Sequence, residues 1–94
     1  MKFEWDADKN KRNIQKHGID FADVPSVFKL PMLTGFDHRK EYGEDRWIGL
    51  GLLKNIIVVV AFTERKDGIT RLISARKATK HEREEYKKAI GYWF

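Results

Sequence analysis

Hydrophobic and polar residues are distributed in short blocks, and the pattern of each block predicts a strand or a helix. Residues 56–62 are almost continuously apolar, which is typical of a strand buried on both faces at the centre of a sheet. Asp67-Gly68 predicts a turn, after which basic and small polar side chains alternate with apolar ones over residues 69–76. Residues 46–53 also have a strand pattern, and Lys54-Asn55 is short enough to join them to residue 56 as a hairpin. Three strands joined by hairpins predict an antiparallel meander.

The N-terminal part predicts one short strand followed by a helix. Residues 2–5 alternate polar and apolar side chains, which indicates a strand. Asp6 is a suitable N-cap for a helix over residues 7–17, and Gly18 stands where a left-handed C-cap residue belongs. The inner face of this helix is predicted to be a thin stripe of three side chains, Ala7, Ile14 and His17.

A second, shorter helix is predicted over residues 20–28. Its apolar face consists of side chains at helical spacing, namely Phe21, Val24, Val27 and Phe28. Pro25 removes a backbone donor inside this segment, so the pattern leaves open whether the helix begins later than residue 20 or bends. Residues 32–36 then predict an edge strand, and residues 37–45 a polar loop.

The last predicted element is a helix that begins after Thr79. Thr79-Lys80-His81-Glu82 has the sequence of a capping box. The buried stripe of this helix is predicted to be Tyr86, Ala89, Ile90 and Trp93. The fold class is therefore α+β, with a short N-terminal strand and two helices, an antiparallel meander and a C-terminal helix, in one domain over residues 1–94.

The hairpin around Asp67-Gly68 predicts which side chains share a face. A two-residue turn places Glu64 opposite Arg71 as a cross-strand ion pair, and Ala61 opposite Ser74. One face is then predicted to carry Thr63, Arg65, Thr70, Leu72, Ser74 and Arg76. Arg65 and Arg76 are roughly 20 Å apart in a flat sheet, so we expect them to bind different phosphates unless the sheet curls.

The charge balance favours an anionic partner. Lys and Arg number 19 against 14 Asp and Glu, which gives a formal net charge of +5. Such a balance suits nucleic acid or an acidic protein. The chain has no cysteine, which excludes disulfides and a thiolate zinc site. It has no apolar run long enough to cross a membrane and begins without an apolar signal core, so we expect a cytoplasmic protein.

The sequence contains no pattern typical of a metal or cofactor site. The three histidines are His17, His38 and His81. His81-Glu82 begins like a zinc-binding helix, but Glu85 stands where the second histidine belongs. A glycine loop of the phosphate-binding kind is also absent from the sequence. We therefore expect neither a metal nor a cofactor.

One block of residues resembles a known family. Phe62-Thr63-Glu64-Arg65 and Ile73-Ser74-Ala75-Arg76-Lys77-Ala78-Thr79, with Glu82-Arg83 and Tyr86 after them, resemble the BrnT family of bacterial type II toxins. Residues 3–6, 16–19 and 44–47 are similar to other parts of the same family. The resemblance implies a RelE-like fold and a ribonuclease toxin that inhibits translation. It also implies neutralisation by a BrnA-type ribbon-helix-helix antitoxin, through which alone DNA would be contacted.

The chemistry of RNA cleavage gives the basic residues possible roles. A metal-independent endoribonuclease needs fixed cations beside the phosphate, and arginine suits this task because its charge persists at every relevant pH. Arg76 is predicted to stabilise the transition state, because it leaves the sheet beside Lys77 at the entrance of the last helix. Arg65 is the predicted second phosphate ligand, and Ser74 can hydrogen-bond the phosphate. The alternative role of each is that of an ordinary residue of a strand or hairpin.

His17 and three further basic residues complete the predicted site. His17 is the candidate for proton transfer, because its ordinary pKa is close to neutrality; capping or packing at the end of its helix is the alternative. Lys77, Lys80 and Arg83 are predicted to attract RNA, or simply to form a solvated face. A different class of function is also consistent with the sequence, namely a non-catalytic basic adaptor that binds nucleic acid or an acidic protein.

Overall fold

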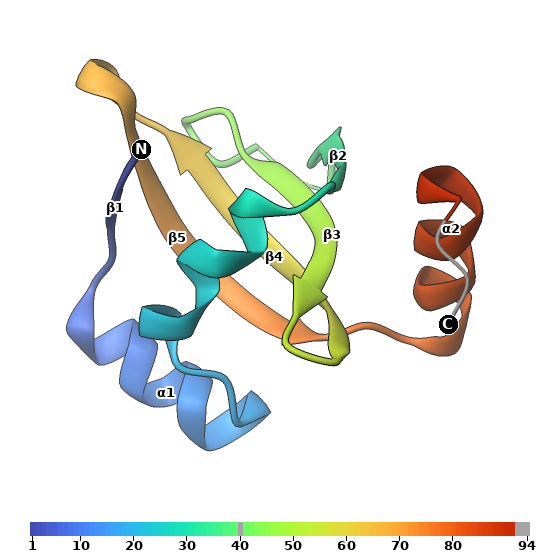
Figure 1. Ribbon diagram of the computed structural model, residues 1–94. Coiled ribbons are helices and arrows are strands. Elements are labelled where there is room, and N and C mark those ends of the chain that lie inside the picture. The colour runs from blue at the N-terminus through green and yellow to red at the C-terminus, as the bar shows by residue number, and fades with distance from the viewer. Residues whose placement is uncertain (40, 92–94) are drawn as a thin grey trace.

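The structure is a computed structural model that describes residues 1–39 and 41–91, and its described strands form one five-stranded sheet in the order β1-β5-β4-β3-β2 (Figure 1). The elements are β1 (Lys2–Glu4), α1 (Ala7–His17), the 3₁₀ helix η1 (Phe21–Lys29), β2 (Leu33–Phe36), β3 (Trp47–Leu53), β4 (Ile56–Glu64), the short 3₁₀ turn η2 (Lys66–Gly68), β5 (Ile69–Lys77) and α2 (Lys80–Ile90). Strand β1 pairs parallel to β5, whereas the other neighbours pair antiparallel. The predicted α+β order is confirmed.

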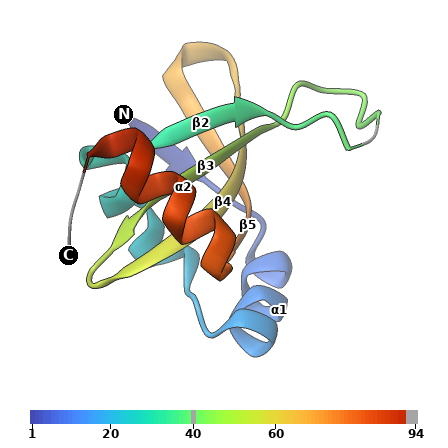
Figure 2. The ribbon, with the colours of Figure 1, turned by 90° about the vertical axis from the view of Figure 1, so that its right-hand side faces the viewer.

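Apolar side chains form a core on each face of the sheet. On the face that we call the η1 face, Val58, Val60 and Phe62 of β4 pack with the buried side of η1. On the α2 face, Ile57 and Val59 pack with Tyr86 of α2. Figures 1 and 2 show the consequence, since η1 and α2 cover opposite sides of the strands. The alternation expected of a central strand therefore builds two cores from β4 alone.

Helix α1 has the predicted ends but not the predicted inner face. Asp6 accepts a hydrogen bond from the backbone of residue 8, and Gly18 adopts the left-handed conformation with a φ of 71°. Ala7 is exposed, however, and Ile14 is 40% exposed. The buried side chain is that of Asn13. The predicted apolar stripe is wrong because this helix packs against the edge of a strand through polar contacts.

Asn13 satisfies the backbone at the point where the edge of β5 is left unpaired. Strand β1 pairs only with residues 69–71 of β5. Beyond it, the Asn13 Nδ2 donates to the carbonyl of Ala75 at 2.9 Å and to that of Ile19 at 3.0 Å. Its Oδ1 accepts from the backbone nitrogen of Ala75 at 3.1 Å. One amide side chain thus replaces a strand partner and ties the end of α1 to β5.

The second predicted helix is a 3₁₀ helix, and it contains Pro25. Phe21, Val24 and Val27 are fully buried and recur every third residue, the repeat of a 3₁₀ helix. Asp20 caps its start by accepting a hydrogen bond from the backbone of residue 22. The predicted apolar face is confirmed, whereas the type of helix was not predicted.

The β4–β5 hairpin corrects the predicted register near the turn. The loop contains three residues, Lys66–Gly68, rather than two, so Glu64 lies opposite Thr70 instead of Arg71. A bulge between Ala61 and Phe62 then restores the predicted pairing of Ala61 with Ser74. Thr70 donates to Glu64 at 3.2 Å. The predicted ion pair between Glu64 and Arg71 is therefore wrong.

The bulge also changes which side chains of β5 share a face. Leu72 belongs to the core of the η1 face, opposite Phe62. Alternation places Arg71 on the α2 face instead, together with Ser74 and Arg76 beyond the bulge. The prediction that Thr70 and Leu72 share a face with Ser74 and Arg76 is wrong for this reason.

Helix α2 begins with the predicted capping box, in which Thr79 and Glu82 exchange both hydrogen bonds. Tyr86 is fully buried and donates to the carbonyl of Pro31 at 2.8 Å, whereas Ala89 is exposed, contrary to the prediction. Trp93, which was predicted to belong to the same stripe, lies outside the described residues. Among the residues that are described, no helix has the length and apolar character needed to cross a membrane.

Candidate active site on the α2 face

Three side chains of β5 give the α2 face its polar character. Arg71, Ser74 and Arg76 lie on this face, and their strand partners on β4 are Thr63, Ala61 and Val59 in that order. The Arg71 and Arg76 side chains are 29% and 38% exposed, and Ser74 is half-buried. Figure 2 shows α2 lying across the same face, with the loop after β2 extending beyond it. All three side chains therefore keep part of their surface in solvent.

Arg76 is fixed by the start of α2. Its two terminal nitrogens donate to the two carboxylate oxygens of Glu82 at 2.8 and 2.9 Å. The same carboxylate accepts from the backbone of Thr79, so the capping box and the arginine hold each other in place. Hydrogen bonds from Arg76 lower the pKa of Glu82 to about 2, and Glu82 raises the pKa of Arg76. Arg76 is therefore a preorganised cation with part of its surface in solvent.

Arg65 belongs to a separate group of charges. Its Nε lies 3.2 Å from Glu4 of β1, and the same carboxylate accepts from Arg71 at 2.7 Å. Arg76 lies opposite Val59, six residues before Arg65 along β4. The structure therefore brings Arg65 together with Arg71 and does not bring it to Arg76. Sequence reasoning missed Arg71, because a two-residue turn assigned it to the opposite face.

His17 lies beside the end of β5 that carries Arg76, because Asn13 ties the last turns of α1 to Ala75. Burial lowers the pKa of His17, with further lowering by the charges of Lys16 and Arg76. The imidazole is consequently neutral at pH 7 and able to accept a proton. Ser74 makes no side-chain hydrogen bond within the described part of the chain.

The other predicted basic residues lie at the end of the sheet. Lys77 and Arg83 line a pocket of about 320 Å³ whose remaining lining includes Ile56 and Ala78. Arg83 also donates to the carbonyl of Ala78 at 3.0 Å. Lys80 is exposed in the first turn of α2 and does not line this pocket. Two of the three predicted RNA-attracting residues are thus close together.

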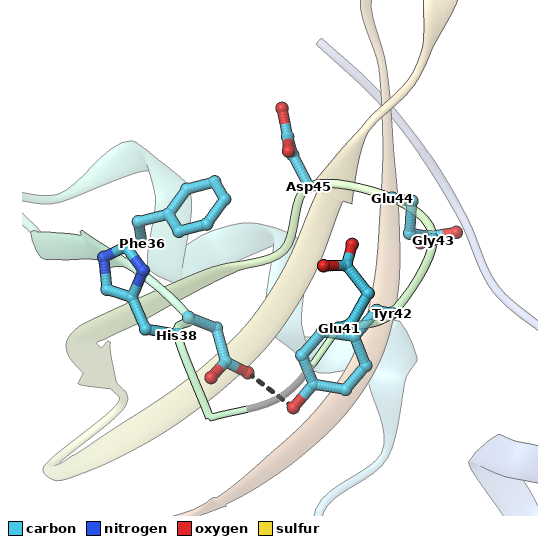
Figure 3. Close-up of a pocket in the computed structure, with 8 residues that line it drawn as sticks. Phe36, His38, Glu41, Tyr42, Gly43, Glu44 and Asp45 are labelled. Carbon is cyan, nitrogen blue, oxygen red and sulfur yellow. Dashed lines mark hydrogen bonds between the residues drawn. The ribbon is translucent and has the colours of Figure 1, made fainter.

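Residues 36–38 and 41–45 line a second, acidic pocket of about 460 Å³. Figure 3 shows it with Phe36 and His38 on one side and Glu41 and Tyr42 on the other. The carboxylate of Asp37 is buried beneath the loop and accepts hydrogen bonds from Arg39 and Tyr42. These bonds, above all that from the Arg39 side chain, hold the pKa of Asp37 well below its usual range. The sequence identified this stretch only as a polar loop.

Metal-binding side chains do not gather in the part of the chain that the structure describes. Within residues 1–39 and 41–91, no group of three or more His, Cys, Asp and Glu side chains is arranged to hold a metal ion. The acidic groups nearest the arginines are instead paired with them, as Glu4 and Glu82 show.

The structure is therefore a small basic α+β domain with arginines held by carboxylates on one face of the sheet, and guanidinium groups are well suited to bind phosphate. A family model described as the ribonuclease toxin BrnT of type II toxin–antitoxin systems matches residues 5–82. The crystal structure of the Brucella abortus ribonuclease toxin BrnT is similar, with a TM-score of 0.67 and 33% identity. That similarity covers 85% of this chain and 99% of the other. The chain belongs to the BrnT family of ribonuclease toxins of type II toxin–antitoxin systems.

Family membership confirms the resemblance, the fold class and the assignment as a ribonuclease. It favours the enzyme over the non-catalytic adaptor, and it implies an RNA substrate and an antitoxin partner. A search of curated protein sequences finds no match to this chain.

Proposed function

We propose that this protein is a metal-independent endoribonuclease whose active site is the α2 face around Ser74 and Arg76. The observation that carries the proposal is the bidentate contact between Arg76 and Glu82, which fixes a cation beside Ser74 on an accessible face. Ser74 and Arg76 are two residues apart along one face of a strand, or about 7 Å, so both can reach one phosphate. The fixed guanidinium needs no reorganisation as negative charge develops on that phosphate.

His17 is the proposed proton acceptor. Its imidazole is neutral at pH 7 and lies close enough to Arg76 for the charge of that residue to affect its pKa. In the proposed step the 2′-oxygen transfers its proton to His17 and attacks the adjacent phosphorus. The bond from phosphorus to the 5′-oxygen breaks, and that oxygen takes a proton from solvent. The products are a 2′,3′-cyclic phosphate and a 5′-hydroxyl.

The remaining basic residues bind RNA outside the reacting phosphate. Arg65 and Arg71 share Glu4, and this group supports binding of a neighbouring phosphate. Lys77, Lys80 and Arg83 attract RNA by charge, as is usual for exposed cations near a nucleic acid. Arg65 is therefore proposed as a ligand of a different phosphate from that held by Arg76.

The biological consequence that we propose is inhibition of translation in the cytoplasm, where the RNA substrate is translated. Neutralisation is proposed to come from a BrnA-type ribbon-helix-helix antitoxin, which would also make any contact with DNA. Membership of a type II toxin family supports the existence of an antitoxin, and we propose that this antitoxin is of the ribbon-helix-helix type.

The test is RNA cleavage by purified, antitoxin-free protein in a metal chelator, followed by mapping of the cut ends. Naked RNA and a translation extract are compared, and the antitoxin encoded beside the toxin is added back to half of each sample. We expect discrete cuts with 5′-hydroxyl ends that disappear when the antitoxin is present. Intact RNA in both samples, from protein that is folded and binds RNA, would show that the proposed activity is wrong.

A further inference from the structure

Arg39, like Arg76, makes two side-chain hydrogen bonds to one carboxylate. Its backbone nitrogen, Nε and Nη2 donate to the carboxylate of Asp37 at 3.1, 2.9 and 2.9 Å. The Asp37 side chain is only 1% exposed, whereas that of Arg39 is 67% exposed. The buried carboxylate therefore fixes the guanidinium from one side and leaves its other side in solvent.

The loop that carries Arg39 is attached to the α2 face. Thr63 of β4 donates to the carbonyl of Asp45 at 2.7 Å, and the backbone of Asp37 donates to that of Arg46 at 2.8 Å. The guanidinium carbon of Arg46 lies 3.9 Å from the centre of the Tyr42 ring, and this cation–π contact joins the loop to the residue that precedes β3. Figure 3 shows the loop passing in front of β4 and β5. These contacts attach the loop to the α2 face, which also carries Arg76.

Arg39 and Arg76 are two like charges that approach each other from different elements. The charge of Arg39 is close enough to Arg76 to lower the pKa of that residue, against the stronger opposite effect of Glu82. Each guanidinium is hydrogen-bonded to a carboxylate of its own, that of Asp37 for Arg39 and that of Glu82 for Arg76. Two cations facing one space repel, and an anion between them removes the repulsion.

We propose that Arg39 and Arg76 form a clamp for one phosphate of the RNA chain, with Arg39 rather than Arg65 as the second ligand. The clamp rests on the proposed active site, because Arg76 belongs to both. It assigns Arg39 to substrate binding and makes it a catalytic residue that contacts the reacting phosphate.

The test compares Arg39→Gln, Arg39→Lys and the charge-matched control Arg12→Gln, which removes an exposed arginine from α1. Two quantities are measured: the single-turnover cleavage rate at a mapped site, and the affinity for the same RNA with a 2′-deoxy sugar there. We expect Arg39→Gln to cut about 100-fold more slowly, as when one transition-state donor is lost. Arg39→Lys should recover part of the rate, because it keeps the charge and loses the fork. The control should stay within about twofold, as a surface change usually does.

A variant that removes both arginines shows whether they act on the same phosphate. The rate of Arg39→Gln/Arg76→Gln should lie well above the product of the two single effects, because residues that act as a unit are not additive. Since Arg39→Gln leaves the buried Asp37 carboxylate without its cation, Asp37→Asn/Arg39→Gln is measured as well, and it should show the same loss without that buried charge.

The outcomes separate the clamp from the proposed function. If the wild type cuts RNA while folded Arg39→Gln cuts and binds within threefold of it, the clamp is wrong and the ribonuclease stands. If the wild type cuts no RNA but its affinity for the 2′-deoxy RNA depends on Arg39 and Arg76 jointly, the clamp stands and the proposed reaction fails. Independent, multiplicative effects of the two arginines would also contradict a shared phosphate.

Discussion

Glu82 is the residue on which the geometry of the proposed site depends most. Its carboxylate closes the capping box of α2 and holds both terminal nitrogens of Arg76. The side chain is 23% exposed, so the pair is partly shielded from solvent. Asp37 has the same relation to Arg39 in the loop. In both cases a carboxylate behind the arginine fixes the direction of the guanidinium.

The depressed pKa of Glu82 predicts how stability depends on pH. The carboxyl titrates near pH 2 when folded, against an ordinary value of 4.5. A carboxyl with a lowered folded pKa contributes stability above its unfolded pKa, and this contribution is lost as the pH falls towards the folded value. The free energy of unfolding of the wild type should therefore decline between about pH 4.5 and pH 2. Glu82→Gln should have a shallower slope in that window and a slower cleavage rate at pH 7.

Urea denaturation at a series of pH values measures this slope, with Glu84→Gln on the exposed side of α2 as the control. Asp37 titrates below its ordinary value as well and contributes in the same direction. An identical slope for the wild type and Glu82→Gln would contradict the assignment of a stabilising Arg76–Glu82 pair.

At the scale of elements, the site depends on how the edge of β5 is completed. Strand β1 covers the first three residues of β5, and Asn13 of α1 takes over at Ala75. The residues on either side of Ala75 are Ser74 and Arg76, so one buried amide positions the part of the strand that carries the proposed chemistry. The bulge nearby has a related effect, because it turns Arg71 to the same face as Ser74.

Asn13→Ala should destabilise the protein by roughly 2–4 kcal/mol, because it leaves two carbonyls and one backbone N–H without their partner in a buried place. Urea or thermal unfolding measures the loss, with Gln15→Ala as the control on the exposed side of α1. A loss below about 1 kcal/mol would mean that solvent replaces the amide at the strand edge.

What the sequence revealed about these elements follows from the range of the interactions involved. Asp6, Gly18 and Thr79 mark helix ends through contacts within a few residues, and all three were predicted correctly. Asn13 acts on a strand 62 residues away, and no local pattern distinguishes it from an exposed helical asparagine. The position of Arg71 depends on a three-residue loop and on a bulge, and the Asp-Gly pair alone specifies neither of them. Arg76 was expected beside the entrance of the last helix, where it lies, whereas its partner Glu82 was interpreted only as a cap.

At the scale of the whole molecule, the net charge of +5 should govern RNA affinity more than RNA choice. The arginines of the α2 face are paired with Glu4 and Glu82, whereas Lys77 and Lys80 are exposed. The exposed lysines are expected to attract RNA over a distance. The arginines that are paired with carboxylates are expected to orient the phosphate once RNA is bound.

Salt dependence separates these two contributions. The logarithm of the affinity for RNA with a 2′-deoxy sugar at the cleavage site should fall linearly with the logarithm of the salt concentration. Lys77→Gln and Lys80→Gln should each reduce the slope by about 0.7 for a single strand, while the single-turnover rate at saturation stays unchanged. Lys11→Gln on α1 is the control and should leave the slope as it is. A lysine variant that lowers the saturated rate instead would belong to the reacting site.

The central claim is that a guanidinium fixed on the α2 face promotes RNA cleavage, and Arg76→Gln tests it most directly. The measurement is the single-turnover rate on one mapped RNA in chelator, beside the wild type and Arg12→Gln. The structure predicts a loss of about 100-fold or more for Arg76→Gln in folded protein, with RNA affinity reduced far less and Arg12→Gln unaffected. A folded Arg76→Gln variant that cuts the same site at the wild-type rate would contradict the account.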